Sequence, residues 1–265
     1  MTKIGFIGAG RMAEALIARS RSPKSIIASD ISKKRLSYLK KKYKIKIAKN
    51  NLQVFKSAQI VILAVKPRNM GQVLGTRDQG PGKKKIIICI AAGIPLSYLQ
   101  KKLPGVPVVR AMPNNPALVG MGMTALAKGK NVSRAQYKKA AAIFKAVGEV
   151  VEVKEKLMDA VTGLSGSGPA YVYQAIEALA YGGIAAGLPK KTAAELALIT
   201  VLGAAYTVLN TGKSPAELRE MVASPGGTTI EGLKALKRRG FSRALIEAVM
   251  AAAKKSKVLS KKWTL

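Results

Sequence analysis

Short apolar runs rich in β-branched residues alternate with longer amphipathic runs through the first half of the chain. The run 59–65 is apolar at nearly every position, which is typical of a parallel strand with both faces buried. We expect strands at residues 3–7, 25–29, 45–47, 59–65, 85–90 and 106–110, and helices at 11–20 and 33–43. Strands that alternate with helices predict a mostly parallel, doubly wound sheet over residues 1–154.

The second half of the chain has no convincing strand pattern. From residue 155 onward, Ala- and Leu-rich helical runs are separated by Gly and Pro at residues 165–169, 187–189, 212–215 and 224–227. We therefore predict an all-α domain over residues 155–265. Its helices are too apolar for isolated surface helices, so we expect them to pack on one another and on a second subunit.

Neither the N-terminus nor the apolar stretches predict a membrane segment or a signal peptide. The chain enters its first expected strand directly. The most apolar stretch, residues 196–209, is shorter than the ~20 residues that a transmembrane helix needs. The single cysteine, Cys89, lies in an apolar run, so it is expected in a buried strand and no intramolecular disulfide can form. These features favour a cytoplasmic protein.

Basic residues strongly outnumber acidic ones. Lys and Arg total 46 against 13 Asp and Glu, a formal charge of +33. Such a balance attracts phosphates and nucleic acids, but the lysines are spread along the whole chain and no nucleic-acid motif accompanies them. We interpret the charge as a solvated surface. The absence of histidine rules out a histidine base or a Ser-His-Asp triad, and no metal site is expected.

A glycine turn follows the first expected strand. The segment from Gly8 to Ala13 has the spacing Gly-x-Gly-x-x-Ala. Gly8 permits the tight turn, Gly10 lets the backbone approach a pyrophosphate, and Ala13 allows close helix packing. The N-terminus of the following helix offers free N–H groups to phosphates. In this strand-turn-helix context the motif predicts a Rossmann-type dinucleotide-binding domain.

The end of the second expected strand carries conflicting signals about the cofactor. Asp30 can bond a ribose 2′-hydroxyl, which favours NADH. Its polar and basic neighbours can hold a 2′-phosphate, which favours NADPH; they are Ser29, Ser32, Lys33, Lys34 and Arg35. We expect NADPH, with NADH as the alternative. Lys66 follows the most buried strand, whose carboxyl end faces the ligand crevice of such a sheet, so it is a further candidate contact.

A turn rich in hydroxyl groups separates two helices of the second domain. Residues 224–229 read Ser-Pro-Gly-Gly-Thr-Thr, and a new helix begins near Thr228. Hydroxyls and free backbone N–H groups converge at that helix N-terminus, where the helix dipole favours negative charge. The turn is therefore a candidate carboxylate site, although a simple helix cap explains the turn alone equally well.

Several segments together resemble the pyrroline-5-carboxylate reductase family, in family order and over essentially the whole chain. The most specific are residues 165–171, Ser-Gly-Ser-Gly-Pro-Ala-Tyr, and the segment 218–233 around the Ser-Pro-Gly-Gly turn. The others are residues 5–10, 64–67, 91–93, 110–114 and 159–164. The resemblance implies an α/β Rossmann-type N-terminal domain and an all-α C-terminal dimerisation domain.

The activity that the resemblance implies is the last step of proline biosynthesis. Hydride passes from NAD(P)H to C5 of the imine 1-pyrroline-5-carboxylate and gives L-proline. The resemblance also implies a homodimer, often assembled further into a ring of dimers (a decamer), with the site completed across the dimer. No specific nucleic acid and no membrane partner are expected.

Residue-level motifs and the resemblance together define a candidate site. The cofactor residues are Ile7, Gly8, Ala9, Gly10, Arg11, Met12, Ser29, Asp30, Lys33, Asn51, Ala64, Val65, Lys66, Pro67 and Ala92. The resemblance implies that Ser224, Gly227, Thr228 and Thr229 hold the substrate carboxylate. It also brings Thr229 close to the ring nitrogen, which makes Thr229 the catalytic candidate. Its hydroxyl can orient that nitrogen, but a neutral hydroxyl is a poor proton donor.

Two other interpretations stay open. A related dehydrogenase of the same two-domain plan would act on another imine or a β-hydroxyacid; the β-hydroxyacid enzymes typically use a lysine that is missing here between Met158 and Gly187. A six-membered imine is discriminated by only about 1–3 kcal/mol per methylene. A basic polyanion-binding protein on an inactive enzyme fold would bind any duplex without turnover, but it has no reason to keep both motifs intact.

Overall fold

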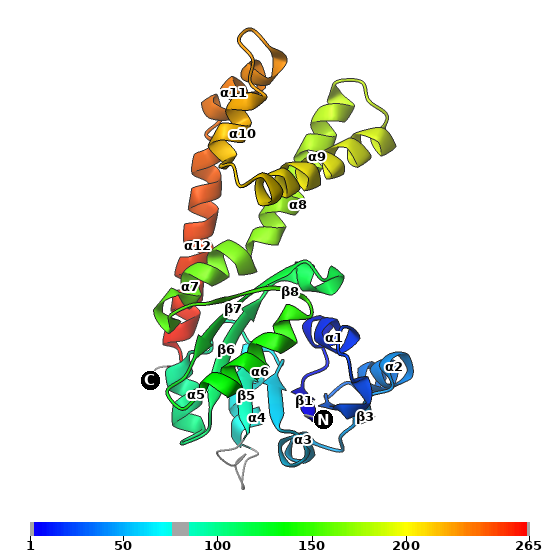
Figure 1. Ribbon diagram of the computed structural model, residues 1–265, viewed down its shortest axis with the longest axis vertical. Coiled ribbons are helices and arrows are strands. Elements are labelled where there is room, and N and C mark those ends of the chain that lie inside the picture. Colours follow the sequence, from blue (N-terminus) through cyan, green and yellow to red (C-terminus); the bar gives the residue numbers. More distant parts are fainter. Residues whose placement is uncertain (1–2, 76–84, 264–265) are drawn as a thin grey trace. The chain divides into compact units, whose positions relative to one another are not determined.

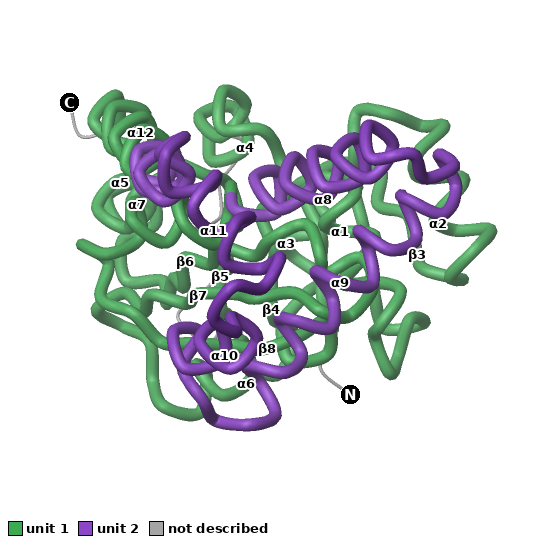
Figure 2. Tube along the Cα trace, turned by 90° about the horizontal axis from the view of Figure 1, so that it is seen from above, with its two compact units in different colours: residues 1–167, 250–265 green, residues 168–249 purple. Residues whose placement is uncertain are grey.

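The computed structural model describes residues 3–75 and 85–263. The chain forms two compact units, one of residues 1–167 and 250–265 and the other of residues 168–249. Figure 2 distinguishes them by colour. All of the described strands belong to the first unit, which we call the sheet unit, and the second, the helical unit, contains helices and turns in its described part.

The sheet unit is built on one eight-stranded sheet in the order β3-β2-β1-β4-β5-β6-β7-β8 (Figure 1). Its strands are β1 (Ile4–Ile7), β2 (Ile26–Ser29), β3 (Lys46–Ile47), β4 (Ile60–Leu63), β5 (Ile86–Cys89), β6 (Val108–Pro113), β7 (Gly122–Lys128) and β8 (Gly148–Glu152). Strands β1 to β6 are parallel, whereas β7 is antiparallel to β6 and parallel to β8. The predicted mostly parallel, doubly wound sheet is confirmed. Its order reverses between β1 and β4, where such sheets bind ligands.

The two faces of the sheet bury separate apolar layers, because side chains alternate along each strand. In β4, Val61 and Leu63 join one layer, and Ile60 and Ile62 join the other. The first layer is closed by α3 (Asn51–Ser57), α4 (Met70–Gly75), α5 (Leu96–Lys102) and α7 (Met158–Val161). The second is closed by α1 (Arg11–Ala18), α2 (Lys33–Tyr43) and α6 (Arg134–Lys145). Short turns of helix complete the unit: η1 (Pro23–Ser25), η2 (Pro67–Asn69), η3 (Asn115–Val119), η4 (Glu155–Leu157) and the π-helical η5 (Thr162–Gly166).

The strands expected from the sequence did not include β7 and β8. β7 reads Gly-Met-Thr-Ala-Leu-Ala-Lys, in which Ala, Leu, Met and Lys favour helices. It is extended because it pairs antiparallel with β6, from Val109 opposite Lys128 to Pro113 opposite Thr124. Tertiary pairing therefore overrides local preference here.

The helical unit contains α8 (Gly168–Ala185), α9 (Lys190–Thr211), α10 (Pro215–Met221), α11 (Thr228–Arg238) and the first part of α12 (Phe241–Lys261). Helices α8 and α9 pack side by side, and a Cβ atom on Gly183 would stand 3.2 Å from the Cβ of Ala193. The predicted all-α C-terminal region is confirmed. Among the described residues of this unit only Ala193 and Ala197 are buried, so most of its apolar side chains face outward in the single chain.

The division between the units differs from the expected domain boundary after residue 154. Met158 of α7 is fully buried in the first apolar layer of the sheet unit. The carboxylate of Asp159 accepts hydrogen bonds from the hydroxyls of Ser256 (2.7 Å) and Ser260 (3.2 Å) on α12. Residues 155–167 and the end of α12 therefore belong to the sheet unit, because their contacts are made there.

Helix α9 is longer than the apolar run from which it was expected. It spans 22 residues, and among the described residues it is the one helix long and apolar enough to cross a membrane. The expectation that this segment is too short to cross a membrane was therefore wrong as to length. The apolar surface of α9 has to be explained by what covers it.

Candidate functional site

A cleft of about 630 Å3 lies at the carboxyl ends of β1, β2 and β4, beside the N-terminus of α1. Most of the predicted cofactor residues line it: Ile7, Gly8, Gly10, Arg11, Met12, Ser29, Asp30, Asn51, Ala64, Val65, Lys66, Pro67 and Ala92. These residues are far apart in sequence and come from several connections of the sheet. The fold therefore brings the predicted cofactor set together in one cavity.

The glycine turn has the geometry that a bound pyrophosphate requires. Gly8 adopts φ +96°, and its N–H donates to the carbonyl of Ser29 at 2.8 Å. A Cβ atom on Gly10 would meet no atom within 4 Å, so this position opens onto free space. Gly10 is also the N-cap of α1 and has no side chain to satisfy the first amides of the helix. Those amides are available to an anion, and the cleft fits a dinucleotide.

Two predicted cofactor residues do not line the cleft. Ala9 is fully buried, and its N–H donates to Oδ2 of Asp30 at 2.6 Å. Lys33 is exposed at the start of α2, outside the lining. Ala9 thus contributes to the shape of the turn, and a cofactor contact from Lys33 stays a prediction.

The polar residues at the end of β2 are already hydrogen-bonded to protein. Oδ1 of Asp30 accepts the N–H of Ser32 at 2.8 Å, in addition to the bond from Ala9. The buried hydroxyl of Ser29 donates to Oδ1 of Asn51 at 2.7 Å. Because the amide oxygen of Asn51 is the acceptor in that bond, its NH2 group is the one that can donate to a ligand.

The candidate carboxylate turn lies in the helical unit. Its N-cap residue is Gly227, and no side chain caps α11 in the described structure. The N–H of Gly227 donates to the carbonyl of Ser224 at 3.0 Å, and a Cβ atom on Gly227 would stand 2.6 Å from Oγ of Ser224. A side chain at position 227 would therefore require the Ser224 hydroxyl to move. Thr228 and Thr229 are exposed there in the first turn of α11, as an open carboxylate site requires.

Two family models match the chain. The model for pyrroline-5-carboxylate reductase dimerisation matches residues 155–259, and the model for coenzyme F420-dependent NADP oxidoreductases matches residues 3–93. Pyrroline-5-carboxylate reductase of Synechocystis sp. is 48% identical over 98% of this chain and 99% of its own length. The chain belongs to the pyrroline-5-carboxylate reductase family. The enzyme of Methanosarcina acetivorans is 46% identical, with 98% of both chains covered.

Solved structures of pyrroline-5-carboxylate reductases have the same fold. The Coxiella burnetii enzyme is 36% identical with a TM-score of 0.90, and 98% of each chain is covered. The Plasmodium falciparum enzyme, solved with NADP bound, is 32% identical with a TM-score of 0.89 at the same coverage. The similarity therefore extends over both compact units.

Sequence reasoning missed several residues of the cofactor cleft in this family member. They are Ile31, Asn69, Gln72, Val73, Ile90, Ala91 and Pro113. Ile31 is 96% exposed although it is apolar, which is an environment suited to contact with a ligand. Pro113 lies in the segment 110–114 and Ala91 in the segment 91–93, both of which carried the resemblance. Had every residue of those two segments been taken as a cofactor contact, Ala91 and Pro113 would have been predicted.

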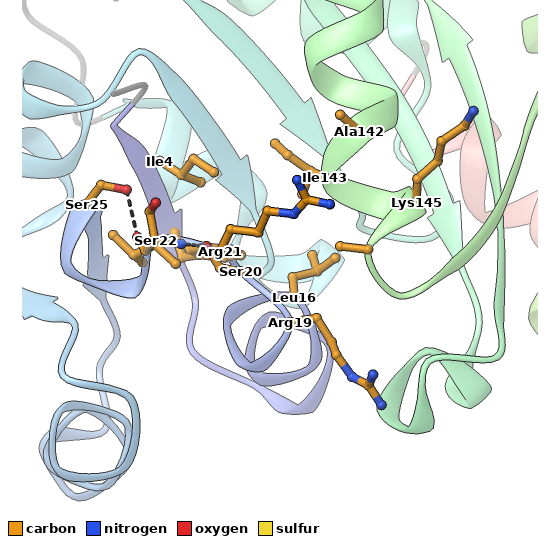
Figure 3. Close-up of a pocket in the computed structure, with 13 residues that line it drawn as sticks. Ile4, Leu16, Arg19, Ser20, Arg21, Ser22, Ser25, Ala142, Ile143 and Lys145 are labelled. Carbon is orange, nitrogen blue, oxygen red and sulfur yellow. Dashed lines mark hydrogen bonds between the residues drawn. The ribbon is translucent and has the colours of Figure 1, made fainter.

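A second hollow, of about 750 Å3, is larger than the cofactor cleft, but no residue of the glycine turn or of the turn at 224–229 lines it. Figure 3 shows the residues that line this hollow. Its lining includes Ile4 and Ile26, the first residues of β1 and β2, so it lies at the amino ends of these strands. Ligands of doubly wound sheets bind at the opposite, carboxyl ends. Arg19, Arg21 and Lys145 give it a basic rim in a chain that is basic throughout. The smaller cleft is therefore the better candidate.

Cys89 takes no part in either site. It is fully buried in β5, as expected, and burial raises the pKa of its thiol to about 12. A thiol that stays protonated is a poor nucleophile. Reaction chemistry that needs a thiolate is therefore excluded at Cys89.

Proposed function

We propose that this protein is a pyrroline-5-carboxylate reductase that uses NADPH to reduce 1-pyrroline-5-carboxylate to L-proline. The observation that carries the proposal is membership of the family over the full chain, with the dinucleotide cleft and the Ser224–Thr229 turn both intact. An enzyme that had lost its activity would be under no constraint to keep the two together. One buried free cysteine and no disulfide suit the reducing cytoplasm, which we propose as its location.

NADPH is the proposed cofactor. The family model that covers residues 3–93 describes NADP oxidoreductases, and the similar Plasmodium falciparum enzyme was solved with NADP. Each oxygen of Asp30 accepts one backbone N–H group, and a carboxylate oxygen can accept a second hydrogen bond, so these contacts do not by themselves exclude a ribose hydroxyl as a further donor. NADH remains the alternative substrate to be tested.

The chain's own residues bind and orient the reactants. The first amides of α1 hold the pyrophosphate, and Val65, Lys66 and Ala92 border the nicotinamide half. The reduced nicotinamide supplies the hydride. The Ser224–Thr229 turn holds the substrate carboxylate, and the hydroxyl of Thr229 orients the ring nitrogen, which takes its proton from water. Alignment of the two reacting carbons then supplies much of the rate.

The direct test is oxidation of NADPH and NADH at 340 nm with 1-pyrroline-5-carboxylate. We expect turnover with NADPH, and slower or no turnover with a six-membered imine or a β-hydroxyacid. If the folded protein oxidises neither cofactor with 1-pyrroline-5-carboxylate, the proposal is wrong. Salt-sensitive binding to DNA without any turnover would support the polyanion-binding alternative.

Thr229→Val should lower kcat about 10- to 100-fold, because one hydrogen bond to a charged partner contributes ~1.5–3 kcal/mol. Thr229→Ser keeps the hydroxyl and is the matched control, expected within a few-fold of the parent protein. The Kd of NADPH, measured by calorimetry, should not change in either variant. Equal losses of turnover and of NADPH affinity in Thr229→Val would exclude this role.

We propose that the helical unit forms a homodimer and that the active site is completed across it, with a ring of dimers as a further level of assembly. The dimerisation model covers residues 155–259, and the outer faces of α8 and α9 carry exposed apolar side chains. They include Val172, Leu179, Tyr181, Leu196, Leu198, Ile199, Leu202, Tyr206 and Leu209. A partner subunit on this surface also accounts for the apolar length of α9 without a membrane.

Light scattering should give a mass of at least twice 28.0 kDa in the absence of detergent. Leu202→Glu, which adds a charge to an exposed apolar site on α9, should lower both the mass and the turnover. Leu118→Glu is the matched control, because Leu118 is similarly exposed but lies outside the region of the dimerisation model. A monomer with full activity would exclude the dimeric site, and a requirement for detergent would support a membrane role for α9.

A further inference from the structure

The buried peptide of Ala9, inside the glycine turn, is held by two side chains from the segment that follows β2. Its N–H donates to Asp30 at 2.6 Å, and its carbonyl accepts Nε of Arg35 at 2.7 Å. Both hydrogen-bonding groups of Ala9 therefore face the segment after β2. This leaves the following amides, from Gly10 onward, as the ones presented at the start of α1.

Arg35 is in turn held by Glu14, in the first turn of α1. The two side chains form an ion pair through NH2 of Arg35 and Oε2 of Glu14. The other oxygen of Glu14 accepts bonds from Tyr43 (2.9 Å), Tyr38 (3.0 Å) and Lys42 (3.3 Å), all on α2. The side chain of Glu14 is only 17% exposed. Burial would raise the pKa of Glu14, but these donors, led by Arg35, outweigh it and lower the pKa to about 2.

These bonds fix the direction of the Arg35 guanidinium. Nε points to Ala9, one terminal nitrogen points to Glu14, and the group lies 5.1 Å from the centroid of the Tyr38 ring. Arg35 is therefore held against the glycine turn and α1 by these contacts. It differs from the exposed lysines Lys33 and Lys34 at the start of α2, which face solvent. The basic side chains near Asp30 therefore have two different roles. Arg35 supports the glycine turn, whereas Lys33 and Lys34 are available to a 2′-phosphate.

We infer that Glu14 and Arg35 are positioning residues for the dinucleotide: they hold the Ala9 peptide so that the next amides receive the pyrophosphate, and they do not select the ribose. The inference rests on the proposed dinucleotide-dependent function. Pre-organisation of a binding loop improves affinity by removing the cost of ordering it on binding. NADPH and NADH share the pyrophosphate, so both should lose affinity by the same factor when this support is removed. A 2′-phosphate ligand would affect NADPH alone.

The test compares Arg35→Gln and Glu14→Gln with Lys41→Gln, which removes one positive charge at an exposed site of α2. The Kd values of NADPH and NADH are measured by calorimetry, kcat and KM are measured with each cofactor, and thermal unfolding reports the fold. We expect each of the first two variants to raise both Kd values about tenfold, in equal proportion, with kcat at saturating cofactor little changed. The double variant Glu14→Gln, Arg35→Gln should lose no more cofactor affinity than the single variant that binds more weakly, because the two residues act through the same contacts.

A rise in the Kd of NADPH alone would make Arg35 a phosphate ligand and overturn the inference. Unchanged Kd values with a lowered unfolding temperature would show a structural role only and would also overturn it. If Arg35→Gln does not fold, Arg35→Lys replaces it, because lysine keeps the charge but cannot make the same pair of hydrogen bonds. The change in the Kd of NADPH is then compared with the change in the Kd of NADH in the same way. Failure of the parent protein to bind either cofactor would instead contradict the proposed function, so the two failures are distinguishable.

Discussion

Gly8→Ala should lower the affinity for NADPH about 100-fold or more and lower the unfolding temperature. Gly8 has φ +96°, a conformation that costs a residue with a side chain ~1–2 kcal/mol. Its added Cβ atom would also stand 2.6 Å from the carbonyl oxygen of Ala64 and 2.9 Å from the nitrogen of Val65. These are backbone atoms at the end of β4, so relief requires the turn or the strand end to move.

Gly10→Ala is the matched control for the fold. Gly10 has φ −69°, which alanine adopts readily, and its Cβ atom would enter open space. This variant should unfold at the same temperature as the parent protein yet bind NADPH weakly, because its methyl group takes the space of the pyrophosphate. Calorimetric titration together with thermal unfolding separates the two effects. Gly8→Ala with parental affinity and stability would contradict the clash.

Glu155→Ala should destabilise the protein by about 3 kcal/mol, because it leaves Arg110 as an uncompensated buried charge. The side chain of Arg110 is 4% exposed, and its NH1 lies 2.7 Å from Oε1 of Glu155. The same oxygen accepts the N–H of Leu96 at 3.0 Å, at the start of α5. Glu155 thus joins η4 to β6 and α5 within the sheet unit. The side chain of Glu155 is 33% exposed, which favours the lower end of the range for broken buried pairs.

The single tryptophan reports this unfolding. Trp263 packs edge-on against Tyr98, with ring centroids 4.8 Å apart, in the sheet unit. Urea unfolding followed by its fluorescence should shift to lower urea in Glu155→Ala. The double variant Arg110→Met, Glu155→Leu should recover part of the loss, since a buried ion pair can often be replaced by apolar residues. An unchanged transition in Glu155→Ala would mean that the pair contributes little.

The parallel half of the sheet could be predicted because its strands are buried on both faces. A short, fully apolar run rich in β-branched residues, such as Ile60–Leu63, is typical of a strand buried on both faces. The same reasoning did not find β7, in which several residues favour helix and which is extended through its pairing with β6 and β8. The length of α9 was also not anticipated, because the helix begins at Lys190 and ends at Thr211, outside the apolar run at residues 196–209.

The sequence by itself determined the family, the six parallel strands and the first two helices, the glycine turn and the candidate carboxylate turn. These features follow from the hydrophobic pattern and the spacing of motif residues, both of which can be read directly from the sequence. The tertiary structure decided what each polar residue near the cleft binds. Asp30, which looked like a ribose partner, is bonded to Ala9, 21 positions away, and Arg35, which looked like a phosphate ligand, is bonded to Ala9 and Glu14. Such contacts depend on how β1, β2 and α2 are brought together in space, and no spacing along the chain specifies which partner a charged side chain will find.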